Sequence, residues 1–95
     1  MSNTKRYQEA LKYEHVTAAG TTIERDGVAK LHLITVNSGA NASLDVFNGP
    51  TITSPTIALV DCNNPVTLGY GGVILGSGIA LRLRGASADI TVIYE

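Results

Sequence analysis

Alternating apolar and polar positions dominate the last seventeen residues of the chain, 79–95. In residues 79–84 every second position is a large apolar residue, Gly85 breaks the pattern, and residues 89–95 alternate in the same way. A period of two is typical of a strand that packs one face on a core. We therefore expect a terminal hairpin of two strands. Its inward positions are Ile79, Leu81, Leu83, Ile90, Val92 and Tyr94.

The same strand signal recurs from residue 15 onward, with turn residues at intervals of about ten residues. The remaining strands are expected over 15–25 with a bend at Gly20, and over 28–36, 43–48, 56–62 and 66–70. Asp26 and Gly27 are the favoured pair for a two-residue hairpin loop. Together these segments predict an all-β fold, a small β-sandwich or jelly-roll-like domain of about seven to eight antiparallel strands.

The expected strand over 28–36 changes its parity. Leu31 and Leu33 point to one face, whereas Ile34 and Val36 point to the other. Two explanations fit this slip: a bulge near Leu33, or a strand that is covered on both faces.

Residues 1–14 are polar and carry no strand pattern. Tyr7, Ala10 and Leu11 have the spacing of one helix face, but the segment is too short for a helix that is stable alone. We expect residues 1–14 to form an N-terminal arm and residues 15–95 to form the β-sandwich domain.

Charged residues are few and unevenly placed. They make up 16% of the chain, against about 25% in a typical soluble domain. From Val46 to Leu81 only Asp61 is charged. A domain this small cannot bury all of that neutral segment, and exposed neutral surface commonly contacts another chain. The single cysteine, Cys62, excludes an internal disulfide, so we expect stabilisation through a homo-oligomer.

Charge and hydropathy also exclude several classes of partner. The net charge of −1 predicts no nucleic-acid partner and no anionic membrane surface. No apolar run approaches the roughly 20 residues of a membrane span, and residues 1–6 are not followed by the apolar core of a signal peptide. We expect synthesis and assembly in a cytoplasm.

No combination of residues predicts catalysis, a cofactor or a metal site. The glycine-rich stretch Gly69–Gly78 does not fit a dinucleotide motif, because Ile74 stands where glycine is needed. Its glycines are expected at a bend, a bulge or a close approach of the backbone. His15, His32 and Cys62 lack the neighbours that a nucleophile and base require. The chain is therefore predicted not to be an enzyme.

Arg82 and Arg84 share the outward face of one expected strand. Two interpretations remain open. The pair is either a solvated face or a set of interface charges that bind carboxylates of a neighbouring subunit, because arginine makes geometrically specific bidentate contacts.

Three segments in this order resemble one class of proteins: "GVAKLHLITVNSGANASLDVFNG", "TIALVDC" and "LGYGGVILGSGIALRLRGASADITVIYE". The chain is similar to small β-sandwich virion proteins of tailed bacteriophages, over about residues 15–95. The motifs of the class are "L-x-x-I-x-V-N-x-G", "S-L-x-V-F/Y-N/D" and "G-I-x-L-x-x-x-G-x-x-A-D-I/V-T-V-x-Y-E". The matching positions include Leu31, Ile34, Val36, Asn37, Leu44, Val46, Phe47, Ile79, Leu81, Gly85, Asp89, Thr91 and Tyr94.

This resemblance implies a capsid cement or decoration protein, a structural viral protein on the capsid surface of the virion. The expected partners are the major capsid protein and other copies of the chain, as a trimer. Candidate partner-binding residues are Tyr7, Leu11 and Tyr13 in the arm, with Arg82 and Arg84 as interface charges. The alternative is a tail, fibre or head–tail adaptor component. Its receptor- or glycan-binding loops would be 37–41, 49–55 and 63–72.

Overall fold

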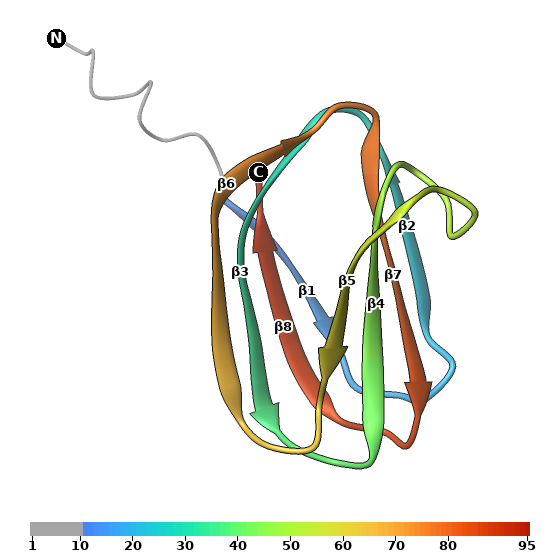
Figure 1. Cartoon of the computed structure of the whole chain (residues 1–95), viewed down its shortest axis with the longest axis vertical. Helices are drawn as coiled ribbons and strands as arrows, with labels where there is room; N and C mark the ends of the chain where they lie inside the picture. The colour runs from blue at the N-terminus through green and yellow to red at the C-terminus, as the bar shows by residue number, and fades with distance from the viewer. Residues whose placement is uncertain (1–10) are drawn as a thin grey trace, which may run out of the picture.

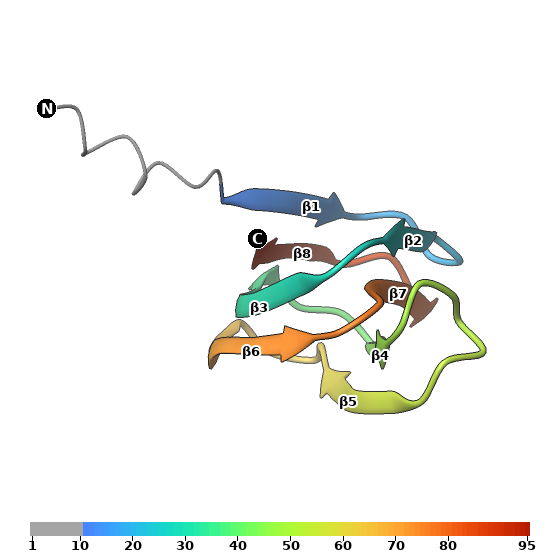
Figure 2. The same cartoon turned by 90° about the horizontal axis from the view of Figure 1, so that it is seen from above.

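The computed structural model describes residues 11–95, which form eight strands. These are β1 (Lys12–Val16), β2 (Thr22–Asp26), β3 (Ala29–Ser38), β4 (Ala42–Asn48), β5 (Thr56–Asp61), β6 (Val66–Leu75), β7 (Gly78–Gly85) and β8 (Asp89–Tyr94). They form two four-stranded antiparallel sheets with the orders β1-β8-β3-β6 and β2-β7-β4-β5. Figures 1 and 2 show the sheets packed as two layers. The predicted all-β fold is confirmed, and the strand order is that of a jelly roll.

The chain crosses from one sheet to the other at nearly every connection. Within residues 11–95, β4 and β5 are the one consecutive pair of strands that are also neighbours. The predicted terminal hairpin is therefore wrong, because β7 and β8 lie in different sheets. The same correction applies to the predicted hairpin loop at Asp26 and Gly27, since β2 and β3 are also in different sheets. A period of two shows which face of a strand is buried but does not show which strand lies beside it.

Backbone hydrogen bonds explain why the last connection does not close a hairpin. The N–H of Ala86 donates to the carbonyl of Asn41, and the N–H of Ala88 donates to the carbonyl of Thr17. The segment between β7 and β8 is thus bonded to two other loops, which Figure 1 shows at the same end of the sandwich.

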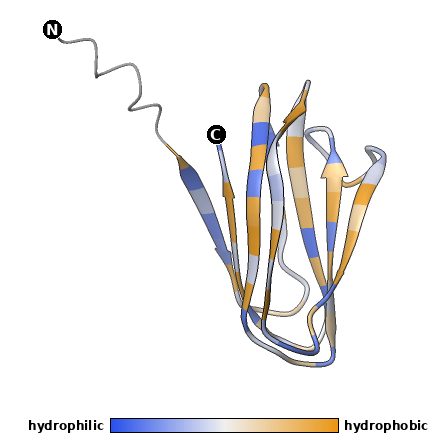
Figure 3. Cartoon of the chain, turned by 60° about the vertical axis from the view of Figure 1, so that its left-hand side comes forward, coloured by the Kyte–Doolittle hydropathy of each residue, from blue (hydrophilic) through white to orange (hydrophobic). Residues whose placement is uncertain are grey.

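The core lies between the two sheets. All six positions that were predicted to point inward from the last two strands are buried, with at most 5% of their surface exposed. The same layer contains Val16, Leu31, Ile34, Val36, Leu44, Val46, Val60 and Cys62. Figure 3 shows the alternation of apolar and polar residues along the strands that creates this layer.

A bulge resolves the change of parity in β3. Its register with both β6 and β8 shifts between Leu31 and Leu33. On β6, Gly71 and Gly72 have φ angles of 65° and 81°, which favour glycine. At the other end of the glycine-rich stretch, a Cβ on Gly78 would lie 2.3 Å from the carbonyl oxygen of Arg25. The expectation that these glycines serve a bulge or a close approach is confirmed at these positions.

The expected boundary between arm and sandwich at residue 15 is wrong. β1 begins at Lys12 and pairs with β8 along its whole length, from Lys12 opposite Tyr94 to Val16 opposite Ile90. The pattern was hidden because an acid, Glu14, occupies an inward position of this strand, opposite buried Val92. The rest of the predicted arm, including Tyr7, lies outside the described residues.

Candidate interaction surfaces

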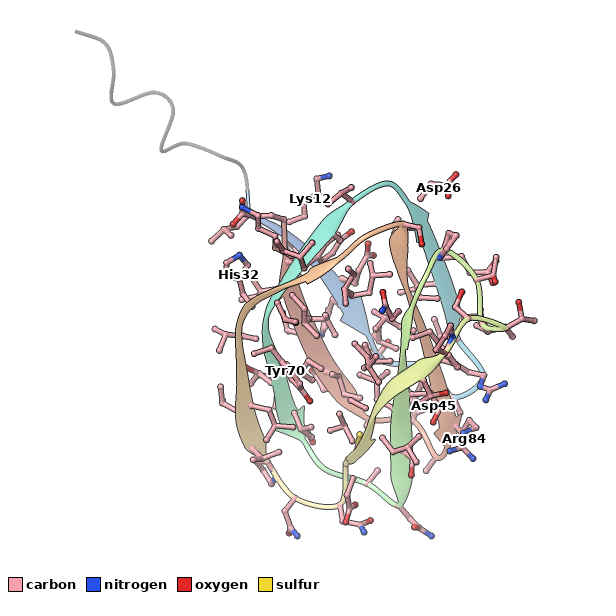
Figure 4. The ribbon with its side chains drawn as sticks, turned by 45° about the horizontal axis from the view of Figure 1, so that its top comes forward. Lys12, Asp26, His32, Asp45, Tyr70 and Arg84 are labelled. Atoms are coloured by element: carbon pink, nitrogen blue, oxygen red, sulfur yellow. The ribbon has the colours of Figure 1, made fainter. Side chains whose placement is uncertain are left out.

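A buried carboxylate binds the two arginines on the outer face of the β2-β7-β4-β5 sheet. Asp45 on β4 lies opposite Arg82 on β7, and its side chain is only 2% exposed. Arg84 donates from Nε and Nη2 to the two carboxylate oxygens at 2.6 and 2.9 Å, and Arg82 donates from Nε at 3.0 Å. Figure 4 shows Asp45 and Arg84 side by side at this face. Arg82 also lies 5.6 Å from the ring centroid of Phe47.

The charges of this cluster compensate one another. Burial by itself would raise the pKa of Asp45, but the hydrogen bonds from Arg84 and Arg82 outweigh burial and lower it. The same hydrogen bond raises the pKa of Arg84. The carboxylate therefore stays ionised at neutral pH, and the cluster joins β4 to β7.

The two arginines do share one face, as the sequence predicted, but both bind a carboxylate of their own chain. Their role as charges in a subunit interface stays a prediction. The sequence analysis did not identify Asp45 as the partner of these arginines. The alternation of residues along β4 places Asp45 on the opposite face from Leu44 and Val46, and this was the signal in the sequence. That alternation could not reveal that β4 pairs with β7.

An apolar depression of about 360 Å³ lies at the start of β1, on the outer face of the β1-β8-β3-β6 sheet. Leu11, Tyr13 and Ile93 line it, together with Thr91 and Lys12. Leu11 is 60% exposed and Tyr13 is 69% exposed. Tyr13 lies opposite Ile93, and Ile93 lies opposite Leu33, so an apolar row continues across three strands. The structure thus brings together two of the three predicted arm residues.

Two histidines of the same sheet bind carboxylates at the two ends of β8. Nε2 of His15 lies 2.6 Å from Asp89, and Nε2 of His32 lies 2.7 Å from Glu95. Asn37 also donates to Asp89 at 3.1 Å. The hydrogen bonds from His15 and then Asn37 lower the pKa of Asp89. These pairs join β8 to its neighbours β1 and β3.

The residues that the sequence analysis weighed for chemistry lie in different environments. Cys62 is fully buried in the core, and burial raises the pKa of its thiol. His15 is half exposed on an outer sheet face. Among residues 11–95, no three His, Cys, Asp or Glu side chains gather to hold a metal ion. No helix in that range is long and apolar enough to span a membrane.

On one side of the sandwich, a polar network closes the gap between the sheets. The edge strands β1 and β2 lie on this side (Figure 2). Glu14 on β1 accepts two hydrogen bonds from Arg25 on β2, at 2.9 and 3.1 Å, and one from the hydroxyl of Tyr94 at 2.6 Å. We call Glu14, Arg25 and Tyr94 the polar side. Their hydrogen bonds join the two sheets, and the bond to Glu14 raises the pKa of Arg25.

The opposite side, formed by the edge strands β5 and β6, exposes apolar side chains instead (Figure 2). Five of the nine exposed large hydrophobic residues in the described chain belong to these two strands. They are Ile57, Leu59, Val66, Val73 and Ile74, which we call the apolar edge. Sequence analysis expected neutral exposed surface in this segment but could not tell which residues would share one side.

The three loops of the alternative prediction do not gather at one end. Residues 37–41 and 63–65 are neighbours, since a Cβ on Gly39 would lie 2.3 Å from the carbonyl oxygen of Asn63. The loop 49–55 lies at the other end (Figure 1), where the N–H of Ile52 donates to Glu24 at 3.0 Å. Residues 66–72, which were predicted as part of the third loop, belong to strand β6.

Comparison with known proteins adds no family to this description. No protein-family model matches the chain, and no curated protein matches it either.

Proposed function

We propose that this protein is a non-enzymatic structural subunit of a tailed-phage virion, a cement protein that binds the major capsid protein on the outside of the head shell. The resemblance of residues 15–95 to small virion proteins supports this proposal. The fold alone does not, because sandwiches and jelly rolls serve many unrelated functions.

The apolar depression of Leu11, Tyr13 and Ile93 is the observation that carries the proposal. A large aliphatic and a large aromatic side chain are exposed next to each other, beside the point where residues 1–10 join β1. Tyrosine is enriched in protein interfaces because its ring provides apolar area and its hydroxyl a polar contact. In this proposal the depression packs against the capsid protein, and many copies together add weak contacts that strengthen the shell.

A binding experiment with expanded capsids that lack the protein tests this function. We expect the purified chain to cosediment with the capsids and the Leu11→Ser/Tyr13→Ser variant to bind at least about tenfold more weakly. Val28→Ser is the matched control, because Val28 is 67% exposed and lies outside the depression.

The two parts of the proposal fail in different ways. If the wild-type chain does not bind capsids, the cement function is wrong. If it binds and the double variant binds equally well, the depression is not the contact. A chain without residues 1–10 tests the predicted arm while leaving β1 intact, since β1 begins at Lys12.

A further inference from the structure

We infer that the apolar edge is a self-association surface, where a second copy of this chain docks around a two-fold axis. This inference does not depend on the proposed function. It concerns the side of the sandwich formed by β5 and β6, whereas the capsid contact was placed on the outer face of β1 and β8.

The apolar edge leaves part of the core uncovered. Val66 lies opposite buried Val36, and Val73 lies opposite buried Leu31. Cross-strand partners point to the same face of a sheet, so both valines point toward the core. They are nevertheless 39% and 44% exposed. Because β6 ends its sheet, no further strand within the described chain covers them.

Side chains on the outer faces extend this surface. Ile74 lies opposite Lys30 and is 63% exposed, and Leu59 lies opposite Asp45 and is 68% exposed. Exposed apolar residues that adjoin an open sheet edge are a predicted association site. Edge strands are commonly protected by charged residues or proline, and β6 contains neither.

The distribution of charge favours an identical copy as the occupant. A two-fold axis places a surface against the same surface of its partner, so every charge near the axis meets a like charge. β5 and β6 contain one charged residue, Asp61, in sixteen positions, whereas β1 and β2 contain five in ten. Asp61 is the last residue of β5, and its carboxylate accepts a hydrogen bond from the N–H of Asn63. The apolar edge can therefore face its own copy without burying like charges.

The sheet geometry defines the arrangement of the pair. An axis perpendicular to the sheets places β6 antiparallel to β6 of the second copy and β5 beside β5 of that copy. The bulge at Gly71 and Gly72 interrupts β6, so backbone pairing uses residues 66–69. Residues 73–75 then contribute side-chain packing. Each copy covers the exposed valines of the other and completes its core.

Light scattering on a size-exclusion column tests the pair. We expect a mass of twice 9.9 kDa for the wild-type chain. Ile74→Lys should raise the dissociation constant by roughly tenfold or more, because its ammonium group would have to lose water against the apolar surface of the second copy. Leu59→Lys is a second variant with the same expectation. Leu11→Lys is the matched control, since Leu11 is 60% exposed on β1, and it should remain a dimer. Circular dichroism of each variant verifies the fold.

Introduced cysteines distinguish a two-fold pair from a ring, since the native Cys62 is buried in the core. Thr67→Cys or Gly69→Cys should form a covalent dimer on mild oxidation, because a residue near a two-fold axis meets its own copy. Tyr13→Cys, on β1, should cross-link much more slowly. A wild-type monomer at every concentration, a trimer, or an Ile74→Lys variant that associates like the wild type would each overturn the inference.

Discussion

The two open sides of this sandwich are closed by different physical means. On the polar side, Glu14, Arg25 and Tyr94 bridge the sheets with hydrogen bonds and one ion pair. On the apolar edge, Val66 and Val73 point toward the core and stay partly exposed. One side is complete within the chain, while the other leaves apolar surface in water.

The difference illustrates two ways of closing the open side of a small β-sandwich, by internal polar contacts or by apolar side chains that another surface can cover. A domain of this size buries a modest fraction of its surface, so an uncovered part of the core is a substantial loss. On the polar side, the hydrogen-bonding groups of Glu14, Arg25 and Tyr94 satisfy one another, so this side needs no partner. Exposed apolar side chains at the apolar edge stabilise the fold only when another surface covers them. The stability of the fold would then depend on assembly.

One of the two largest expected effects comes from breaking the polar side. Glu14→Ala leaves Arg25 and the Tyr94 hydroxyl without their shared acceptor, and we expect a loss of about 2 kcal/mol in the free energy of unfolding. The estimate stays below that for a fully buried pair because Arg25 is half exposed to water. Urea unfolding measures this loss in the monomeric Ile74→Lys background. Lys12→Ala, on the same strand, is the control, and an equal effect of both substitutions would contradict a stabilising network.

The same substitution made on both sides compares their core contacts directly. Val16→Ala on β1 removes a side chain that is 1% exposed, so it should cost about 2 kcal/mol in the monomer. Val73→Ala on β6 removes one that is 44% exposed and should cost less than about 1 kcal/mol. In the wild-type background the cost of Val73→Ala should increase with protein concentration, because the proposed dimer covers this residue. If Val16→Ala and Val73→Ala lowered the free energy of unfolding equally at all protein concentrations, the two sides of the sandwich would not differ in this way.

Tyr94→Phe is expected to have the smallest effect, about 1 kcal/mol at neutral pH, because it removes one hydrogen bond to Glu14. Burial, and then the bond to Glu14, raise the pKa of Tyr94 above its ordinary value of 10.0. The neutral hydroxyl is thus favoured in the folded state. Its contribution is complete below the unfolded pKa and is lost as pH rises through the folded pKa.

Unfolding measured across alkaline pH checks this sign. The stability difference between the wild type and Tyr94→Phe should shrink as pH rises above about 10. A difference that is constant across this range would show that the hydroxyl does not titrate as a group bonded to Glu14.

The sequence by itself determined the strands and their inward faces. The period of two placed Ile79, Leu83, Ile90 and Val92 correctly in the core, because alternation along a strand is a local property. The change of parity over residues 28–36 also indicated the bulge in β3, as one of two explanations for that change. The period of two could not find β1 at Lys12, because Glu14 occupies an inward position that an apolar residue would normally mark.

Only the tertiary structure decided which strands are neighbours, and with them the candidate surfaces. Asp45 meets Arg82 and Arg84 because β4 pairs with β7, although about forty residues of chain separate them. Glu14 meets Arg25 because β1 and β2 end different sheets on the same side. The apolar edge exists because β5 and β6 have no outer neighbour within the described chain. Periodicity reports the environment of each residue along its own strand, whereas partners across strands depend on how the whole chain is folded.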